Sequence, residues 1–265
     1  MRFLLLGSLE LRGHDGTWIR LNRTKHRQLL ALLLLQANNA ISMEQLVDGM
    51  WPDNPPYSAK ANIKTYVSAI RPLVATAGGR IETVPRGYQL LVDPDSVDKL
   101  LFDKYVHLGT RAAREGDDEL QVEYLERAIR LWRGDALQDL PSGRGPLLDA
   151  ATRMHEKFVS VLQDLTAGLM RLDRNDEAID YLRMALSREP LRERSWSLLM
   201  IALHRDGRQA DSLSAYLKYR TMLVDTMGLE PGRALRELHQ KILTGEAIPP
   251  DGLARFSRGP RAGRA

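Results

Sequence analysis

The chain has 265 residues, of which 43% are hydrophobic and 27% are charged, a composition typical of a globular protein with one or two domains. It has no cysteine, which excludes disulfides and thiolate metal sites and favours a reducing cytosol. The longest apolar run, residues 29–35, is too short to span a bilayer, and the apolar N-terminus is typical of a strand and not of a signal peptide. We therefore expect a cytoplasmic protein that does not bind a membrane.

The net charge of +4 is unevenly distributed. Residues 1–96 carry 11 Lys and Arg against 8 Asp and Glu, whereas residues 97–247 carry 23 against 25 and residues 248–265 carry 4 against 1. A basic N-terminal part, a near-neutral central part and a basic C-terminal part are typical of a protein whose N-terminal part binds a polyanion. Many neutral proteins have halves that differ this much, so the charge needs the support of motifs.

The N-terminal third begins with short strands. Residues 2–6 and 9–12 are apolar runs separated by a glycine, and residues 18–21 predict a further strand of the same small sheet. Thr24 is expected to cap a helix that runs to about Ala37, because its leucines fall on one stripe.

Two further helices follow. Ser42 and Gln45 form the Ser-x-x-Gln pattern of a capping box, which predicts a short helix that ends before Pro52. Ser58 can cap a third helix, whose apolar residues recur at helical spacing on one face. These residues are Ile63, Val67, Ile70 and Val74.

Residues 81–84 and 88–92 predict a β-hairpin with its turn at the sequence PRG. A small sheet, three helices and a hairpin, in that order, are typical of a winged helix-turn-helix, in which the third helix enters the major groove and the hairpin is the wing.

After the polar junction at residues 93–96 the pattern changes to helices alone. Residues 105–128, 162–190 and 196–219 each match the spacing of a tetratricopeptide helix pair, and the last two are 34 residues apart, which is the tetratricopeptide period. The Gly- and Pro-rich segment 134–147 has the composition of an insertion between the first two pairs. A last helix is expected to begin with Pro231 near its first turn.

The predicted fold is therefore mainly α with a small β content: an N-terminal winged helix-turn-helix followed by an all-α tetratricopeptide-like domain. We place a DNA-binding domain at residues 1–94, the helical domain at residues 97–245, and a disordered basic tail at residues 246–265.

The polar face of the third helix is the candidate DNA-reading surface, because base edges need donors and acceptors on a helix that fits the major groove. The alternative is a solvated helix face, but the hairpin and the capped helix beside it favour DNA. The proposed base contacts are Asn62, Lys64 and Thr65, with Lys60 and Ser68 on the same face, and the proposed phosphate contacts are Arg71 and Arg86.

Basic residues outside the third helix complete the set of candidates. Arg86 at the hairpin tip is placed as a wing residue would be, although turn arginines are often just exposed, and Arg80 has a similar standing. Lys25 and Arg27 lie at the start of the first predicted helix, where a helix N-terminus favours anions. They can hold a phosphate there or be solvent-exposed charges, and the sequence favours neither.

The sequence contains no pattern for catalysis or for a cofactor. Its six histidines are scattered, and the HExxH, GxxxxGK[ST] and GxSxG motifs are all missing. We therefore expect no catalytic residue, no cofactor and no metal site.

With these residues in place, the chain resembles the short form of the Streptomyces antibiotic regulatory protein family over about residues 1–245. The resemblance rests on FLLLGSLELR, RQLLALLLLQAN, LVDGMWPDNPPYSAKANIKTYVSAIR and IETVPRGYQL, and on the series PLRERSWSLLMIALHRDGRQADSLSAYLKYR and MGLEPGRALRELHQKIL. It implies an OmpR-like winged helix joined to a bacterial transcriptional activation domain. It further implies an activator of a biosynthetic gene cluster that binds tandem direct repeats of double-stranded DNA near the −35 element and contacts RNA polymerase holoenzyme.

The chain departs from that family at the end of the third helix, where relatives commonly carry basic residues at the positions of Ala69 and Pro72. The departure predicts weaker non-specific affinity with a flatter salt dependence. Because proline disfavours a helix interior, we expect the helix to end or kink near Ile70, past its reading segment.

Two other functions remain open from the sequence. A tetratricopeptide adaptor with a winged helix that does not bind DNA is the main alternative, and an enzyme is the third. For the activator, two copies on direct repeats are expected to associate head-to-tail, because direct repeats have no two-fold axis.

Overall fold

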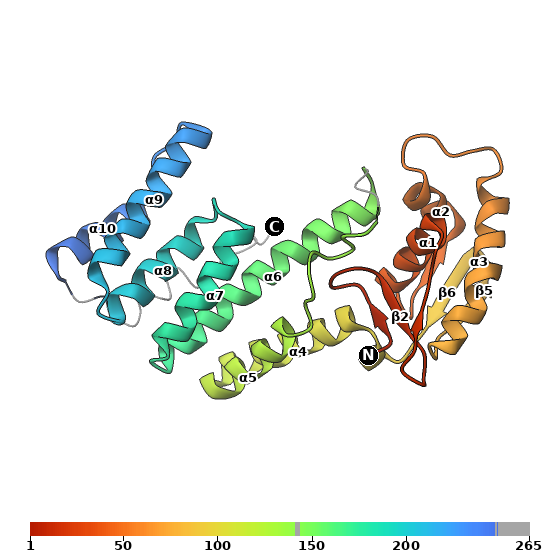
Figure 1. The fold of residues 1–265 in the computed structure, drawn as a ribbon, viewed down its shortest axis with the longest axis horizontal. Helices are drawn as coiled ribbons and strands as arrows, with labels where there is room; N and C mark the ends of the chain where they lie inside the picture. Colours follow the sequence, from red (N-terminus) through yellow and green to blue (C-terminus); the bar gives the residue numbers. More distant parts are fainter. Residues whose placement is uncertain (141–143, 247, 249–265) are drawn as a thin grey trace, which may run out of the picture. The chain divides into compact units, whose positions relative to one another are not determined.

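The computed structural model describes residues 1–140, 144–246 and 248. The chain divides into two compact units (Figure 1). The first contains residues 1–105 and 127–157, and the second contains residues 106–126 and the described residues from 158 onward. The expected disordered tail at residues 246–265 lies almost wholly outside the described residues.

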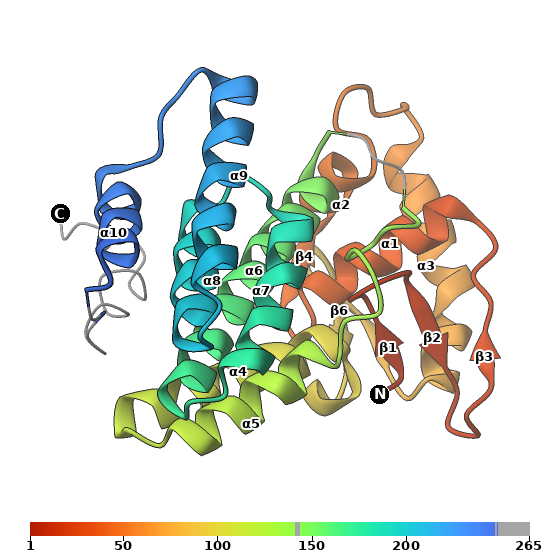
Figure 2. The same cartoon turned by 60° about the vertical axis from the view of Figure 1, so that its left-hand side comes forward.

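A small antiparallel sheet opens the first unit, as predicted (Figure 2). Its strands are β1 (Phe3–Leu4), β2 (Glu10–Arg12) and β3 (Trp18–Ile19), paired in that order. Phe3 pairs with Leu11, and both side chains are fully buried, so this sheet anchors the core of the unit.

Helices α1 (Thr24–Leu35) and α2 (Met43–Met50) form as expected, with one correction at α1. The capping box of α2 is confirmed, because Ser42 Oγ accepts from the N–H of Gln45 while Gln45 Oε1 accepts from the N–H of Ser42. Thr24, however, is the first helical residue of α1 and not its cap, a position that Arg23 occupies without a side-chain hydrogen bond.

Helix α3 (Ala59–Thr76) continues past Ile70, so the prediction that it ends there was wrong, whereas the kink given as the alternative stays a prediction. Pro72 lies inside the helix, where its missing N–H cannot donate to the carbonyl of residue 68 and the interruption costs roughly 3 kcal/mol. The helix continues because Val74 and Ala77, beyond the proline, are fully buried. Burial of this apolar face outweighs the local preference for a break.

The predicted hairpin is confirmed as β5 (Arg80–Val84) and β6 (Gly87–Leu91), which is the wing. A third strand that the sequence analysis did not predict, β4 (Ala40–Ser42), pairs with the other edge of β6 and gives the order β4-β6-β5. Gly87 permits this pairing, because a Cβ at that position would collide with the carbonyl oxygen of Ile41.

The described residues after β6 are mainly helical, and their helix pairs coincide with the predicted repeats. The short 3₁₀ turn η1 (Pro94–Ser96) leads to α4 (Asp98–Glu115), which contributes residues to both units, as α6 does. The remaining helices are α5 (Asp118–Ile129), α6 (Pro146–Arg171), α7 (Asn175–Arg188), α8 (Glu193–Arg205), α9 (Gln209–Met227) and α10 (Arg233–Thr244). Pro231 precedes α10, whose N-cap is Gly232.

Helices α8 and α9 of the second unit pack against each other through a pair of aromatic side chains. Trp196 of α8 and Tyr219 of α9 lie with ring centroids 5.7 Å apart, and both are nearly fully buried. The indole N–H of Trp196 donates to the carbonyl of Pro190, so its one polar group is satisfied inside the core. Both residues are positions of the last predicted tetratricopeptide match, residues 196–219.

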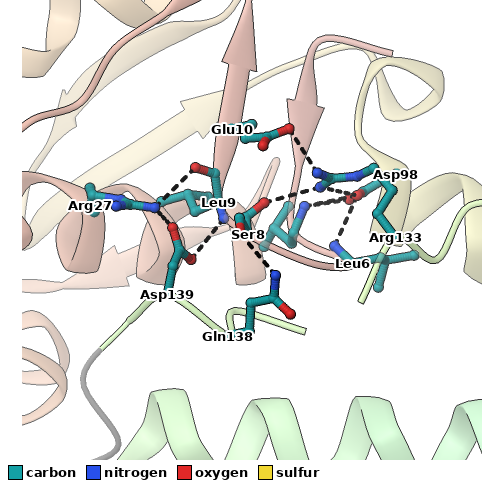
Figure 3. Close-up of polar contacts among 10 residues, drawn as sticks. Leu6, Ser8, Leu9, Glu10, Arg27, Asp98, Arg133, Gln138 and Asp139 are labelled. Atoms are coloured by element: carbon teal, nitrogen blue, oxygen red, sulfur yellow. Dashed lines mark hydrogen bonds and ion pairs between the residues drawn. The ribbon is translucent and has the colours of Figure 1, made fainter. Parts of the chain in front are cut away.

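The described part of segment 134–147 lies against the N-terminal sheet within the first unit (Figure 3). The N–H of Leu137 donates to the carbonyl of Leu5, and the carboxylate of Asp139 accepts from the N–H of Leu9. The segment expected to be an insertion between helix pairs therefore continues the core of the first unit.

Candidate nucleic-acid interface

Helix α3 has one buried and one exposed face. Ile63, Val67 and Ile70 are at most 1% exposed, which fixes the rotation of the helix. The opposite side carries most of the sequence-predicted residues. Lys60, Lys64, Thr65 and Ser68 are exposed, whereas Asn62 is half-buried.

The polar side chains of this face already donate hydrogen bonds within the helix. Thr65 Oγ1 donates to the carbonyl of Ala61 at 3.2 Å, and Ser68 Oγ donates to the carbonyl of Lys64 at 3.1 Å. Asn62 Nδ2 donates to Ser58 Oγ at 3.2 Å. Ser58 is the N-cap residue of α3, but its side chain does not form the expected capping hydrogen bond. The lone pairs of both hydroxyls and the Asn62 carbonyl oxygen remain as acceptors.

The two lysines of α3 differ in their surroundings. Lys60 lies 3.6 Å from Glu44 of α2, and both side chains are about two-thirds exposed, so the pair contributes little to stability. The ammonium group of Lys64 has no hydrogen-bond or ion-pair partner within the described residues. Lys64 therefore needs to break no contact before it meets an anion.

Arg86 lies in the two-residue turn between β5 and β6, and its side chain is exposed. Its backbone carbonyl accepts from the N–H of Met43 at 2.9 Å, which holds the wing against the start of α2. The guanidinium has no partner in the part of the chain that the structure describes. Arg80, at the other end of β5, forms an ion pair with Glu82 at 2.5 Å.

Arg71 joins the helix to the wing. Its Nη2 donates to Thr83 Oγ1 at 2.7 Å, its Nε donates to the carbonyl of Ile81 at 3.3 Å, and its guanidinium lies 5.9 Å from the centre of the Tyr88 ring. The sequence assigned this residue to phosphate; the structure gives its guanidinium several protein partners in the wing.

Lys25 and Arg27 likewise have partners inside the protein. Lys25 Nζ donates to the carbonyl of Met50 at 2.8 Å and lies 4.8 Å from the Trp51 ring, and burial lowers the pKa of Lys25. Arg27 forms an ion pair with Asp139 and donates to the carbonyl of Leu9 (Figure 3).

The positions that depart from the family pattern are both on the exposed side of α3. Ala69 and Pro72 are exposed, and they follow Thr65 along the helix at intervals of four and three residues. They extend the candidate surface as an apolar strip toward the wing end of the helix.

Two further residues of this region were missed by the sequence analysis. Thr83 carries the hydroxyl that accepts from Arg71, a contact between elements that no local pattern signals. Tyr57 is fully exposed just before α3, and the only available signal was an aromatic residue next to two prolines.

Within the described residues, no group of three or more His, Asp or Glu is arranged to hold a metal ion. None of the helices described is both long and apolar enough to cross a membrane.

Comparisons with known proteins define the class. Residues 97–243 match the family model of the bacterial transcriptional activator domain, and residues 16–90 match that of the transcriptional regulatory protein C-terminal domain. The fold and these matches are those of a transcriptional regulator with an OmpR-like winged helix and a helical activator domain.

Individual relatives narrow the class to a family. The chain is 33% identical to Regulatory protein DnrI of Streptomyces peucetius, with 93% of each chain covered. It is 35% identical to Transcriptional regulator RedD of Streptomyces coelicolor, over 89% of this chain and 68% of that one. The structure of Mycobacterium tuberculosis EmbR in complex with a low-affinity phosphopeptide matches with a TM-score of 0.85 at 30% identity, over 97% of this chain and 68% of that one. The chain belongs to the Streptomyces antibiotic regulatory protein family.

Proposed function

We propose that the protein is a sequence-specific DNA-binding activator of a biosynthetic gene cluster, with α3 in the major groove and the wing over the adjacent backbone. The observation that carries the proposal is the exposed face of α3, with Lys64 unpaired among the described residues and Arg86 likewise free at the wing tip. A base-reading helix needs a polar exposed face on a rigid, buried support, and α3 has both.

The hydrogen bonds of α3 suggest what each side chain reads. Thr65 and Ser68 donate to their own helix and offer acceptors, which suit the amino groups of cytosine or adenine. Asn62 retains its carbonyl oxygen and one N–H, the combination that pairs with adenine. Lys64 can donate to guanine.

The remaining basic residues are assigned according to the protein partners that their charged groups already have. Arg86 is the proposed phosphate contact of the wing, and Lys60 can reach a phosphate after leaving Glu44. We assign Arg71 to positioning the wing, and we leave Lys25 and Arg27 out of the interface because their charged ends have protein partners.

The family further supports a fuller version of this function. Two copies would bind tandem direct repeats near the −35 element, associated head-to-tail, and the helical domain would contact RNA polymerase holoenzyme. We propose that this takes place in the cytoplasm. The boundary between residues 1–94 and 97–245 is part of the same proposal.

The test is fluorescence anisotropy of the purified protein on the promoter beside its own gene and on a scrambled duplex, at low and near-physiological salt. We expect a preference of about a hundredfold or more that persists at the higher salt. Equal, salt-sensitive binding to both duplexes would contradict a specific reader, and no binding to any promoter fragment would favour a protein-binding adaptor.

A matched pair of variants tests whether α3 carries the DNA-binding surface. Lys64→Gln should weaken specific binding by about tenfold, the loss expected of one base contact. Lys218→Gln removes an exposed lysine of α9 in the second unit and should leave binding unchanged. Equal losses in the two variants would indicate general charge attraction.

A further inference from the structure

The first unit contains a cleft of about 460 Å³ outside the proposed DNA-binding surface. One wall comes from α1, β4 and α2 of the winged helix, and the other from the beginning of α4 and the first turns of α6. All of these residues belong to the same compact unit. The volume is within the range of sites that bind small molecules in proteins.

The interior of the cleft is apolar. Leu32 and Ile41 contribute from the winged helix, and Ala150 and Met154 contribute from α6, each less than a tenth exposed. Phe102 of α4 completes this surface and is held edge-on by Trp132, with ring centroids 5.6 Å apart. Such a surface accepts an aromatic or aliphatic body and offers it few hydrogen bonds.

The wall formed by α4 and α6 has more positive than negative charge. Lys99 and Lys157 share a single carboxylate, that of Asp103, with a distance of 2.8 Å from Lys99 Nζ. Arg153 also lines the cleft and has neither an ion-pair nor a hydrogen-bond partner among the residues that the structure describes. Three cations thus face one carboxylate, while the opposite wall carries Asp48.

We propose that this cleft binds a small acidic molecule with an apolar body, whose anionic group meets Arg153 and Lys157 and whose body lies on Leu32, Ile41 and Met154. The carboxylate of Asp48 repels an anion from the α2 side and so sets the orientation. Arg153 gains a charge-assisted hydrogen bond that it lacks in the free protein.

The test uses two dyes of nearly the same shape on the full chain. Anilinonaphthalene sulfonate carries one anionic group on an apolar body, and N-phenyl-1-naphthylamine is its uncharged parent. We expect the sulfonate to bind with a dissociation constant of about 10 µM, and the parent at least about fivefold more weakly. Equal affinities for the two dyes would overturn the assignment of the anionic group.

Variants place the dye. Arg153→Gln should weaken the sulfonate about fivefold and leave the uncharged dye unchanged, whereas Arg111→Gln, at an exposed arginine of α4 in the second unit, should change neither. Ala150→Trp fills the cleft and should abolish binding of both dyes. Unchanged sulfonate binding in Arg153→Gln, or in an Ala150→Trp protein with native circular dichroism, would overturn the proposal.

Discussion

The guanidinium of Arg71 in α3 donates a hydrogen bond of 2.7 Å to the hydroxyl of Thr83 in the wing. The same side chain donates to the carbonyl of Ile81, so one residue of α3 contacts two residues of strand β5. The direction of the wing, and with it the position of Arg86, therefore depends in part on the side chain of Arg71.

We propose that Arg71 positions the wing and that Arg86 contacts a phosphate, and one variant tests each role. Thr83→Val removes the acceptor without changing charge, and it should weaken DNA binding about threefold, as expected for one hydrogen bond, while leaving the salt dependence unchanged. Arg86→Gln should weaken binding to all sequences and lower the salt slope by about one. Anisotropy titrations between 50 and 200 mM salt measure both quantities.

Arg71→Gln decides between the two roles of that residue. A loss of affinity with the slope of the parent protein indicates positioning of the wing. A slope lowered by about one, with Thr83→Val binding normally, would show that Arg71 contacts phosphate after all.

Pro72 affects both helix stability and charge, and two substitutions distinguish these effects. Pro72→Ala should raise the thermal midpoint of unfolding, because the helix regains an N–H donor next to the buried Val74, and should leave the salt slope unchanged. Pro72→Arg should also steepen the salt slope by about 0.9 through a new phosphate contact.

Ala69→Arg provides an independent check on the same strip of α3, with a similar increase in slope expected. Leu217→Arg adds the same charge at an exposed position of α9 and serves as the control. If all three arginine variants steepen the slope equally, the gain comes from net charge and not from contacts made by α3.

Gly87 is required by the approach of β4 and not by its own backbone angle. Gly87→Ala places a methyl group against the carbonyl of Ile41 and should destabilise the protein by about 1–3 kcal/mol, with a parallel loss of DNA affinity as the wing shifts. Gly134→Ala, where the nearest atoms belong to the flexible Gln138 side chain, should be nearly neutral. Denaturant unfolding of both variants measures the difference, and similar losses in the two would dismiss the close approach as the cause.

Features that depend on residues close together in the chain could be predicted from the sequence. They are the capping box of α2, the hairpin and the buried stripe of α3, and all three are present in the structure. The helix end near Ile70 was predicted wrongly because the burial of Val74, a tertiary effect, overrides the local preference of Pro72.

Contacts between segments that are far apart in the chain could not be predicted from the sequence. Strand β4 is three residues long, and it exists because β6 offers an edge 45 residues or more away. In the candidate site, helical periodicity identified the exposed face of α3. It could not show that Arg27 meets Asp139 or that Arg71 meets Thr83, because those partners come from other elements.

Asp98, the first residue of α4, is fully buried in the first unit. Its carboxylate accepts from the N–H groups of Leu5 and Leu6 at 2.8 and 2.9 Å and lies 3.7 Å from Arg133 (Figure 3). Burial nevertheless raises the pKa of Asp98 from 3.8 to about 6, and the hydrogen bonds and Arg133 offset this only in part.

The raised pKa of Asp98 predicts the direction in which the stability of the fold changes with pH. Between pH 3.8 and about 6 the folded protein holds a proton on Asp98 that the unfolded chain releases, so this group stabilises the fold below that range and loses its contribution as the pH rises through about 6. Asp98→Asn does not titrate. The unfolding free energy of the parent protein minus that of the variant should therefore increase by about 2 kcal/mol from pH 7.5 to pH 4.

Taking the difference cancels the other carboxylates, whose titration both proteins share. Urea unfolding followed by circular dichroism at several pH values supplies the measurement. A difference that stays flat, or that shrinks as the pH falls, would mean that the N–H groups of Leu5 and Leu6 and the charge of Arg133 dominate over burial. The carboxylate would then act as a fixed anion joining the beginning of α4 to the N-terminal sheet.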